Sequence, residues 1–149
     1  MPLLLAKLPL VLHIVAETGA ANSFIRHPRT QLRIRGADHA DVQREADLVC
    51  ANLGGALLAT NLVALVVILS PGGGVGGAAA AEVLDETSRL LVLALASYHV
   101  WPMYRAFARL TSPGAALKYQ DVPMGGPAVH LIVHWVCFAS LLCSALFGG

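Results

Sequence analysis

LLLAKLPLVLHIVAETGAANSFI, residues 3–25, is long and apolar enough to cross a lipid bilayer, yet it contains His13 and Glu17. A spanning helix needs about 20 predominantly apolar residues. An ionisable side chain at the centre of such a helix costs roughly 2.5–3.5 kcal/mol when it is charged, so it tends to mark a functional site. The stretch therefore predicts a membrane helix that contributes to a buried polar centre.

The composition of the whole chain is also typical of a membrane protein. Of 149 residues, 56% are hydrophobic and 13% are charged, and the mean hydropathy is +0.67. A soluble domain of this size is less apolar. The net charge is +1 and no basic stripe with interleaved aromatic residues occurs, so we expect no nucleic-acid partner. The cysteines lie in apolar runs, which indicates packing residues rather than a disulfide framework or a zinc site; they are Cys50, Cys137 and Cys143.

Hydropathy divides the chain into four segments of spanning length. They are residues 3–25, 47–70, 88–110 and 127–147. We therefore predict an all-α fold in which residues 1–149 form a single integral membrane four-helix bundle with short loops. The first segment also has the early lysine, apolar core and small residues of a cleavable signal peptide. A signal peptide gains nothing from a buried histidine and glutamate, so we expect the segment to be retained.

Basic residues are unequally divided between the connections. Eight of the ten flank or occupy the first and third connections, and only Lys7 and Arg89 lie at the opposite face. The positive-inside rule therefore places the two basic connections in the cytosol. Both termini and the Gly-rich connection at residues 71–81 then lie on the other side. We expect a location in the endoplasmic reticulum membrane with lumenal termini.

Helical spacing places ionisable residues on shared faces. His13 and Glu17 are four residues apart, about 40° around a helix, and His130 and His134 repeat that spacing. His99 lies near the middle of the third segment. The candidate catalytic residues are Glu17, His13, His99, His130 and His134, and no metal ligand is assigned.

Four further polar residues are candidates for substrate binding. They are Asn61, Tyr98, Tyr104 and Arg105. Each has a structural alternative, because a buried asparagine can simply join helices, an arginine can anchor the topology and a tyrosine can lie at the membrane interface.

Two features of the backbone are predicted to shape the bundle. Gly54 and Gly55 share the second segment with Asn61 and would let a neighbouring helix approach closely. Pro102 should free a carbonyl one turn earlier and kink the third segment beside His99, which can form a pocket.

Several spacings carry a resemblance to known proteins. They are His13-x-x-x-Glu17, Asn22-x-Phe24, Arg26-x-Pro28-x-x-Gln31-Leu32, Tyr98-His99-x-x-Pro102-x-x-x-x-x-x-Arg109 and Gly125-Gly126-Pro127-x-x-His130-x-x-x-His134. The chain resembles a group of small four-span integral membrane proteins from fungi, some of them associated with natural-product pathways. In size and number of spans it also resembles the fungal anthrone-oxygenase-like membrane proteins, in architecture alone. The resemblance implies a role in secondary metabolite biosynthesis.

The pattern of residues favours a membrane-embedded enzyme of secondary metabolism acting on a lipophilic small molecule. In a low-dielectric pocket Glu17 and His13 can both be neutral and exchange a proton, which suits isomerisation, cyclisation or dehydration without a cofactor. His99 and one of His130 and His134 could then orient or protonate an oxygen of the substrate, while apolar walls exclude water. The expected partners are this substrate and the lipid bilayer, and association of several copies of the chain stays open.

Two other classes of function remain open from the sequence. A metal- or haem-binding oxidoreductase or oxygenase could take its ligands from the same histidines and glutamate on facing helices. A transport, proton-pathway or assembly protein could use the buried groups as a relay or to join helices.

Overall fold

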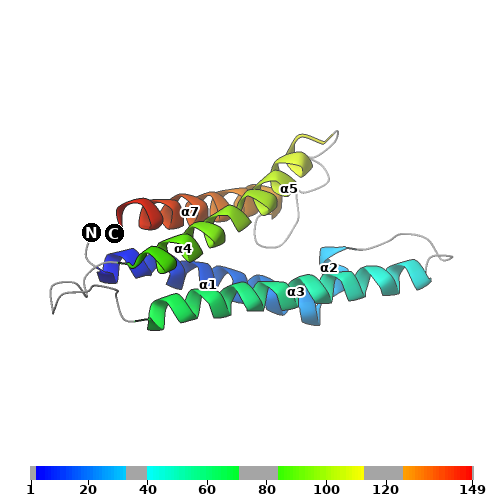
Figure 1. Cartoon of the computed structure of the whole chain (residues 1–149). Coiled ribbons are helices and arrows are strands. Elements are labelled where there is room, and N and C mark those ends of the chain that lie inside the picture. The colour runs from blue at the N-terminus through cyan, green and yellow to red at the C-terminus, as the bar shows by residue number, and fades with distance from the viewer. Residues whose placement is uncertain (1–2, 33–39, 71–83, 113–125, 149) are drawn as a thin grey trace.

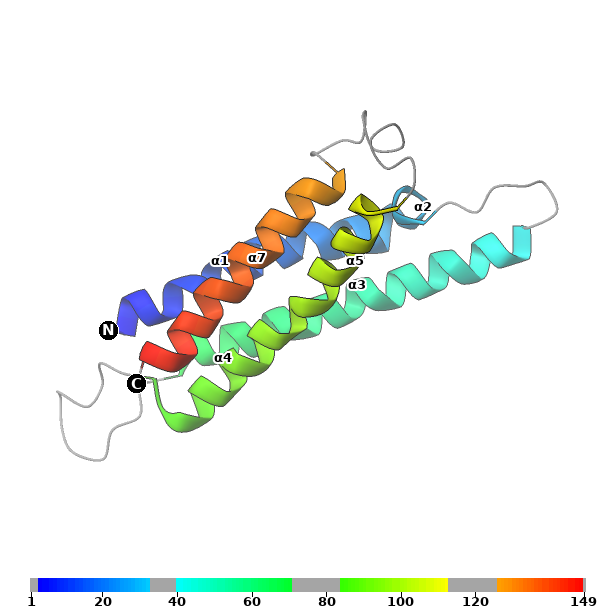
Figure 2. The ribbon, with the colours of Figure 1, turned by 90° about the horizontal axis from the view of Figure 1, so that it is seen from above.

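The computed structural model describes residues 3–32, 40–70, 84–112 and 126–148, and these segments are helical over most of their length. The helices are α1 (Leu3–Arg26), α2 (Pro28–Gln31), α3 (Ala40–Leu69), α4 (Glu86–Tyr98), α5 (Val100–Leu110) and α7 (Gly126–Phe147). Helices α1 and α3 lie side by side in one layer, and α4, α5 and α7 form the other (Figures 1 and 2). Both ends of the chain lie at the same end of the bundle. The predicted all-α bundle is confirmed.

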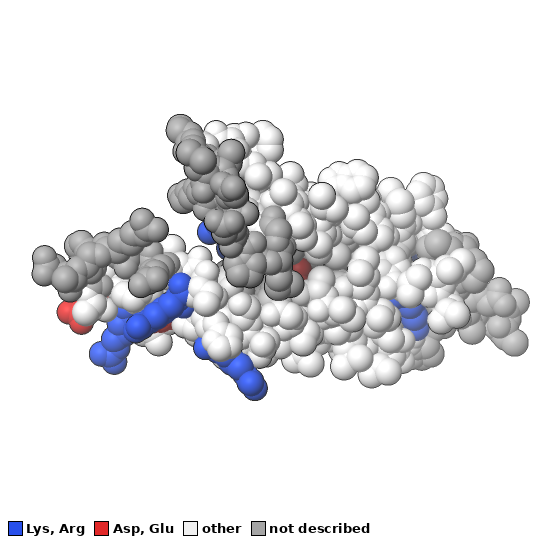
Figure 3. Space-filling view, turned by 180° about the vertical axis from the view of Figure 1, so that it is seen from behind, with Lys and Arg blue, Asp and Glu red and all other residues white. Residues whose placement is uncertain are grey.

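Three helices are long and apolar enough to cross a membrane. They are Leu4–Arg26, Ala40–Leu69 and Gly126–Phe147. Large apolar side chains such as Leu62, Val15 and Trp135 are more than 60% exposed on the outside of the bundle, as expected for a surface that faces lipid. On the face drawn in Figure 3, Lys and Arg side chains lie toward the two ends, and a broad band between them carries none. The chain is an integral membrane protein.

The predicted third span is not one continuous helix. It consists of α4 and α5, which are separated at His99. Pro102 has no N–H to donate to the carbonyl of Tyr98, and its ring would clash with that carbonyl in a regular helix. In the same turn the amide of His99 bonds to the oxygen of Ala96, 3.0 Å away, rather than one residue further back. The interruption is one residue long, since His99 itself keeps helical backbone angles, and it coincides with the buried histidine.

The second span begins earlier than predicted. Helix α3 starts at Ala40 instead of residue 47, so Arg44 and Glu45 lie on the helix and not in the connection. Arg29 on α2 pairs with Asp47 on α3, with 3.1 Å between Nε and Oδ2. Three basic residues of the first and third connections, Arg33, Arg35 and Lys118, lie outside the described residues, and so does the Gly-rich connection.

The two basic residues predicted on the less basic side both bind helix ends. Lys7 Nζ donates to the carbonyl oxygens of Ile68 and Ser70, at 2.8 and 2.7 Å, where α3 ends. Arg89 Nε donates to the carbonyl of Ala145, at 2.8 Å, near the end of α7. The last carbonyls of a helix have no intrahelical partner, and a cation also interacts favourably with the negative end of the helix dipole. These residues therefore satisfy the helix ends at this side of the bundle.

Gly54 lets α1 and α3 approach closely, whereas Gly55 does not contribute. A Cβ atom at Gly54 would lie 2.6 Å from a side-chain carbon of Ile25 and 3.0 Å from the carbonyl oxygen of Ala21. A Cβ at Gly55 would meet nothing within 4 Å. The prediction for Gly54 is confirmed, and that for Gly55 is wrong because the residue after Gly54 is turned 100° around the helix, away from α1.

This difference between neighbouring glycines gives a matched test of the packing. We expect Gly54→Leu to destabilise the protein by about 1–3 kcal/mol, since the added carbons must displace backbone of α1. Gly55→Leu should be neutral or slightly stabilising, because leucine is a better helix former than glycine. The measurement is thermal unfolding of both purified variants in detergent. Equal stability of the two variants would contradict the close approach.

Candidate functional site

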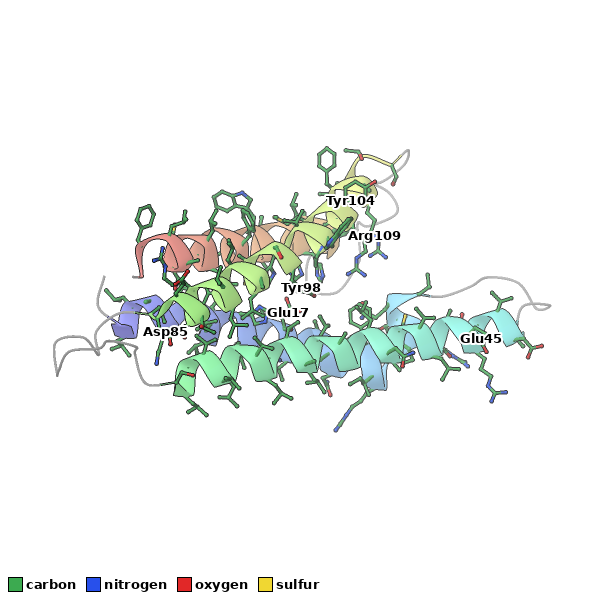
Figure 4. The ribbon with its side chains drawn as sticks, viewed as in Figure 1. Glu17, Glu45, Asp85, Tyr98, Tyr104 and Arg109 are labelled. Carbon is green, nitrogen blue, oxygen red and sulfur yellow. The ribbon has the colours of Figure 1, made fainter. Side chains whose placement is uncertain are left out.

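Four ionisable side chains meet in the middle of the bundle. His13 and Glu17 come from α1, His99 from the break between α4 and α5, and His134 from α7. Their exposed fractions are 0%, 1%, 0% and 4%, respectively. Figure 4 shows Glu17 and Tyr98 pointing toward one another between the two layers. We refer to Glu17, His13, His99 and His134 as the buried cluster.

The three histidines of the cluster form a chain of ring contacts. His13 Nδ1 is 2.9 Å from His99 Nε2. The other ring nitrogen of His99, Nδ1, is 2.8 Å from His134 Nδ1. Both distances are those of hydrogen bonds between nitrogens. Because a neutral imidazole donates from one nitrogen and accepts at the other, His99 can join its two neighbours without any ring being charged.

Glu17 is held at one oxygen and leaves the other without a hydrogen bond. The Tyr98 hydroxyl donates to Glu17 Oε2 over 3.2 Å. Glu17 Oε1 lies 3.5 Å from His134 Nδ1 and 3.7 Å from His99 Nδ1. Within the described segments, Oε1 has no hydrogen-bond partner, and neither has His13 Nε2. Buried polar atoms without a partner are rare, so each of these atoms marks a place where a further group is expected.

A cavity of about 150 Å³ adjoins the cluster. Both polar and apolar side chains line the cavity. The polar members are Glu17, Tyr98, Arg105, His130 and His134, and the other lining residues are Ala20, Phe24, Leu53, Leu57, Trp101 and Pro102. An apolar pocket with a few convergent polar groups is the usual form of a small-molecule site.

The predicted catalytic residues differ in their distance from the centre. His13, Glu17, His99 and His134 belong to the buried cluster. His130 lies beside it, with its ring centroid 4.8 Å from that of His134, and lines the cavity. All five candidates are therefore in or next to one site.

Two of the predicted substrate-binding residues line the cavity and two do not. Tyr98 and Arg105 line it, and the Arg105 guanidinium lies 5.7 Å from the centre of the Phe24 ring. Asn61 instead donates to Thr18 Oγ1 over 3.0 Å and joins α3 to α1. Tyr104 is 66% exposed on the outer side of α5, because it is turned 100° from Arg105. The assignments of Asn61 and Tyr104 to the substrate site are corrected accordingly.

The apolar wall of the cavity was not predicted as part of the site. Leu53 and Leu57 are four residues apart on α3, and Phe24 lies two turns after Glu17 on α1. Spacings of four and seven residues place side chains on one face of a helix, so these residues could have been predicted from the sequence to share a face. Trp101 also lines the cavity.

Residues of the cluster are also arranged as metal ligands can be. His13, Glu17 and His99 each offer one ligand atom, and these atoms lie within 4.8 Å of one another. Imidazole and carboxylate suit zinc, iron and other first-row divalent ions.

No family model matches the chain, and no curated protein or solved structure is significantly similar to it.

Proposed function

We propose that the protein is a membrane-embedded enzyme that acts on a lipophilic small molecule by acid/base chemistry. The observation that carries the proposal is that polar and ionisable side chains converge with apolar ones on a single cavity within a membrane bundle; the polar ones are Glu17, Tyr98, Arg105, His130 and His134. Polar groups at this depth are costly, and interhelical contacts alone could be made by serine or threonine. Their convergence on a cavity favours chemistry over helix association.

Each polar group of the cavity has a role in this proposal. The hydrogen bond from the Tyr98 hydroxyl to Glu17 Oε2 forms a pair that can give and take a proton at the cavity wall. His134, which contacts His99, can bind or protonate a substrate oxygen. Arg105 adds a fixed positive charge to the same wall, where it stabilises negative charge that develops on an oxygen.

The surroundings of the cavity favour a hydrophobic substrate. Phe24, Leu53, Leu57 and Trp101 contribute apolar walls, which suit the apolar part of a lipophilic substrate. Isomerisation, cyclisation and dehydration can each proceed by proton transfer. We further propose a place in secondary metabolism, which is what the resemblance to fungal membrane proteins implies.

A deletion strain tests the proposal even while the substrate is unidentified. The gene is deleted in the source organism, and the strain is complemented with wild type or with Tyr98→Phe. Lipid-soluble metabolites are then compared by mass spectrometry, together with the membrane level of each protein. We expect a compound to accumulate in the deletion strain, to disappear with wild type and to decline more slowly with Tyr98→Phe. Identical metabolite profiles in all strains would contradict an enzymatic function.

The orientation in the membrane is part of the proposal. The basic connections are assigned to the cytosol and both termini to the lumen of the endoplasmic reticulum, because lysine and arginine are retained on the cytosolic side. We expect glycosylation tags at either terminus or at Val75 to be modified, and a tag near Gly36 to stay unmodified. A cytosolic C-terminus would contradict this orientation.

A further inference from the structure

We propose that Glu17, His99 and His134 bind a divalent first-row transition metal ion whose open coordination positions face the cavity. This inference deepens the proposed function, since the ion would bind an oxygen of the lipophilic substrate. It departs from the sequence-based expectation of a cofactor-independent enzyme. Binding of the ion itself does not depend on the identity of the substrate.

The three ligand atoms form a triangle of suitable size. His99 Nδ1 and His134 Nδ1 are 2.8 Å apart, and Glu17 Oε1 lies 3.7 and 3.5 Å from them. One point lies about 2.0 Å from all three atoms, which agrees with zinc–nitrogen and zinc–oxygen bonds of about 2.0–2.2 Å. This point lies close to the plane of the three atoms, so positions above and below the plane remain for other ligands. Two histidines and one carboxylate are also the types of ligand that bind non-haem iron.

The free oxygen of the glutamate supports this assignment. Glu17 Oε1 is fully buried and has no hydrogen-bond partner in the described part of the chain. No lysine or arginine nitrogen of the described residues lies within 4.0 Å of it, and the contacts to His99 and His134 are ion pairs only when one of these histidines is protonated. A buried carboxylate is strongly unfavourable unless it is paired or coordinates a metal. A divalent ion at the centre of the triangle would supply the missing partner.

The contacts behind the ligands also have the form expected around a metal. The Tyr98 hydroxyl holds Glu17 by Oε2 and thereby leaves Oε1 directed at the histidines. His99 Nε2 contacts His13 Nδ1, so a proton on Nε2 would leave Nδ1 free to coordinate. Metal-binding histidines commonly have such a partner on the second nitrogen. We therefore assign His13 to support of His99 rather than to the ion, although His13, Glu17 and His99 form a wider set within 4.8 Å.

The position of the triangle connects the ion to the cavity. Glu17 and His134 both line the cavity, whereas His13 and His99 do not. Glu17 and His134 would therefore hold the ion beside the cavity, where it would polarise the carbon–oxygen bond of a bound substrate. The Tyr98 hydroxyl and the second oxygen of Glu17 remain beside it for proton transfer. The ion thus complements the acid/base groups of the proposed function.

Metal analysis of the purified protein tests the site directly. The full chain is purified in detergent through a tag without histidine, and its zinc, iron, manganese, nickel and copper contents are measured by mass spectrometry. We expect about one ion per chain in the wild type and in His130→Gln. Glu17→Gln and His134→Gln should each retain less than a tenth of it, and His13→Asn should weaken binding by roughly 10–100-fold. His130 is the matched control, because it lies one turn from His134 on α7 and lines the same cavity.

A second measurement guards against variants that fail to fold and against loss of the ion during purification. Protein stripped with a chelator is titrated with Co²⁺, whose visible absorption reports nitrogen and oxygen ligands, and each variant is checked by size-exclusion chromatography. Saturable absorption in the wild type and His130→Gln, absent from folded Glu17→Gln, would support the site. Wild-type protein that binds neither Co²⁺ nor Zn²⁺, or equal binding by all variants, would overturn it.

The outcomes for metal and for function can be separated. Turnover by stripped protein that stays free of metal would overturn a role of the ion in the reaction and leave the proposed enzyme intact. Stoichiometric metal in a protein whose deletion changes no metabolite would establish the site and contradict the proposed enzyme.

Discussion

Glu17→Gln is expected to lower product formation by about a hundredfold or more, with little change in the amount of protein in the membrane. Glutamine has nearly the same shape and can still accept a hydrogen bond from Tyr98 at its carbonyl oxygen. It cannot exchange a proton, and it carries no negative charge for a metal ion. The loss therefore follows from the acid/base role and from the proposed metal site alike.

Glu45→Gln provides the matched control for this experiment. Glu45 is an exposed glutamate on α3, well away from Glu17 (Figure 4). Its substitution should leave conversion of the accumulated compound unchanged. The measurement is the rate at which the complemented strain removes that compound, divided by the membrane level of each variant. Full activity in Glu17→Gln would reduce the residue to a contact between helices and would favour a transport or assembly role.

Substitution of His99 is expected to have the second large effect, and its size should depend on which ring nitrogen is imitated. The side-chain amide group of asparagine ends close to the position of Nδ1, where its oxygen can coordinate an ion or its nitrogen can donate a hydrogen bond, and the amide group of glutamine ends close to the position of Nε2. His99→Gln keeps an amide group in the place of Nε2, near His13. It removes Nδ1, which contacts His134 Nδ1 at 2.8 Å. We expect about a hundredfold loss of activity for His99→Gln and about a tenfold loss for His99→Asn.

The double variant shows whether His99 and Glu17 act as a unit. The losses of activity caused by substituting residues of one catalytic assembly are strongly non-additive. The double variant Glu17→Gln with His99→Gln should therefore be about as active as the less active of the two single variants. The same metabolite conversion is measured for all three proteins. Losses that multiply in the double variant would mean that the two residues act independently. Equal activity of His99→Gln and His99→Asn would contradict a specific role for Nδ1.

Part of the candidate site was predictable from spacing alone. His13 with Glu17 and His130 with His134 are each four residues apart, so each pair had to share a helix face. The cost of ionisable groups in apolar segments singled out the same residues before any contact was known. Tyr104 and Asn61 could not be judged in this way, because exposure of one and the Thr18 partner of the other depend on neighbouring helices.

The sequence by itself determined that the chain is helical, that it belongs in a membrane and which ionisable residues share a face, because length, hydropathy and a 3.6-residue period are local properties. Only the tertiary structure decided that His134 rather than His130 contacts His99, and that the break falls at His99. The period of a helix fixes the angles between its own side chains, but not its rotation or depth against another helix. Those are set by packing between helices, as where Gly54 lets α3 approach the backbone of α1.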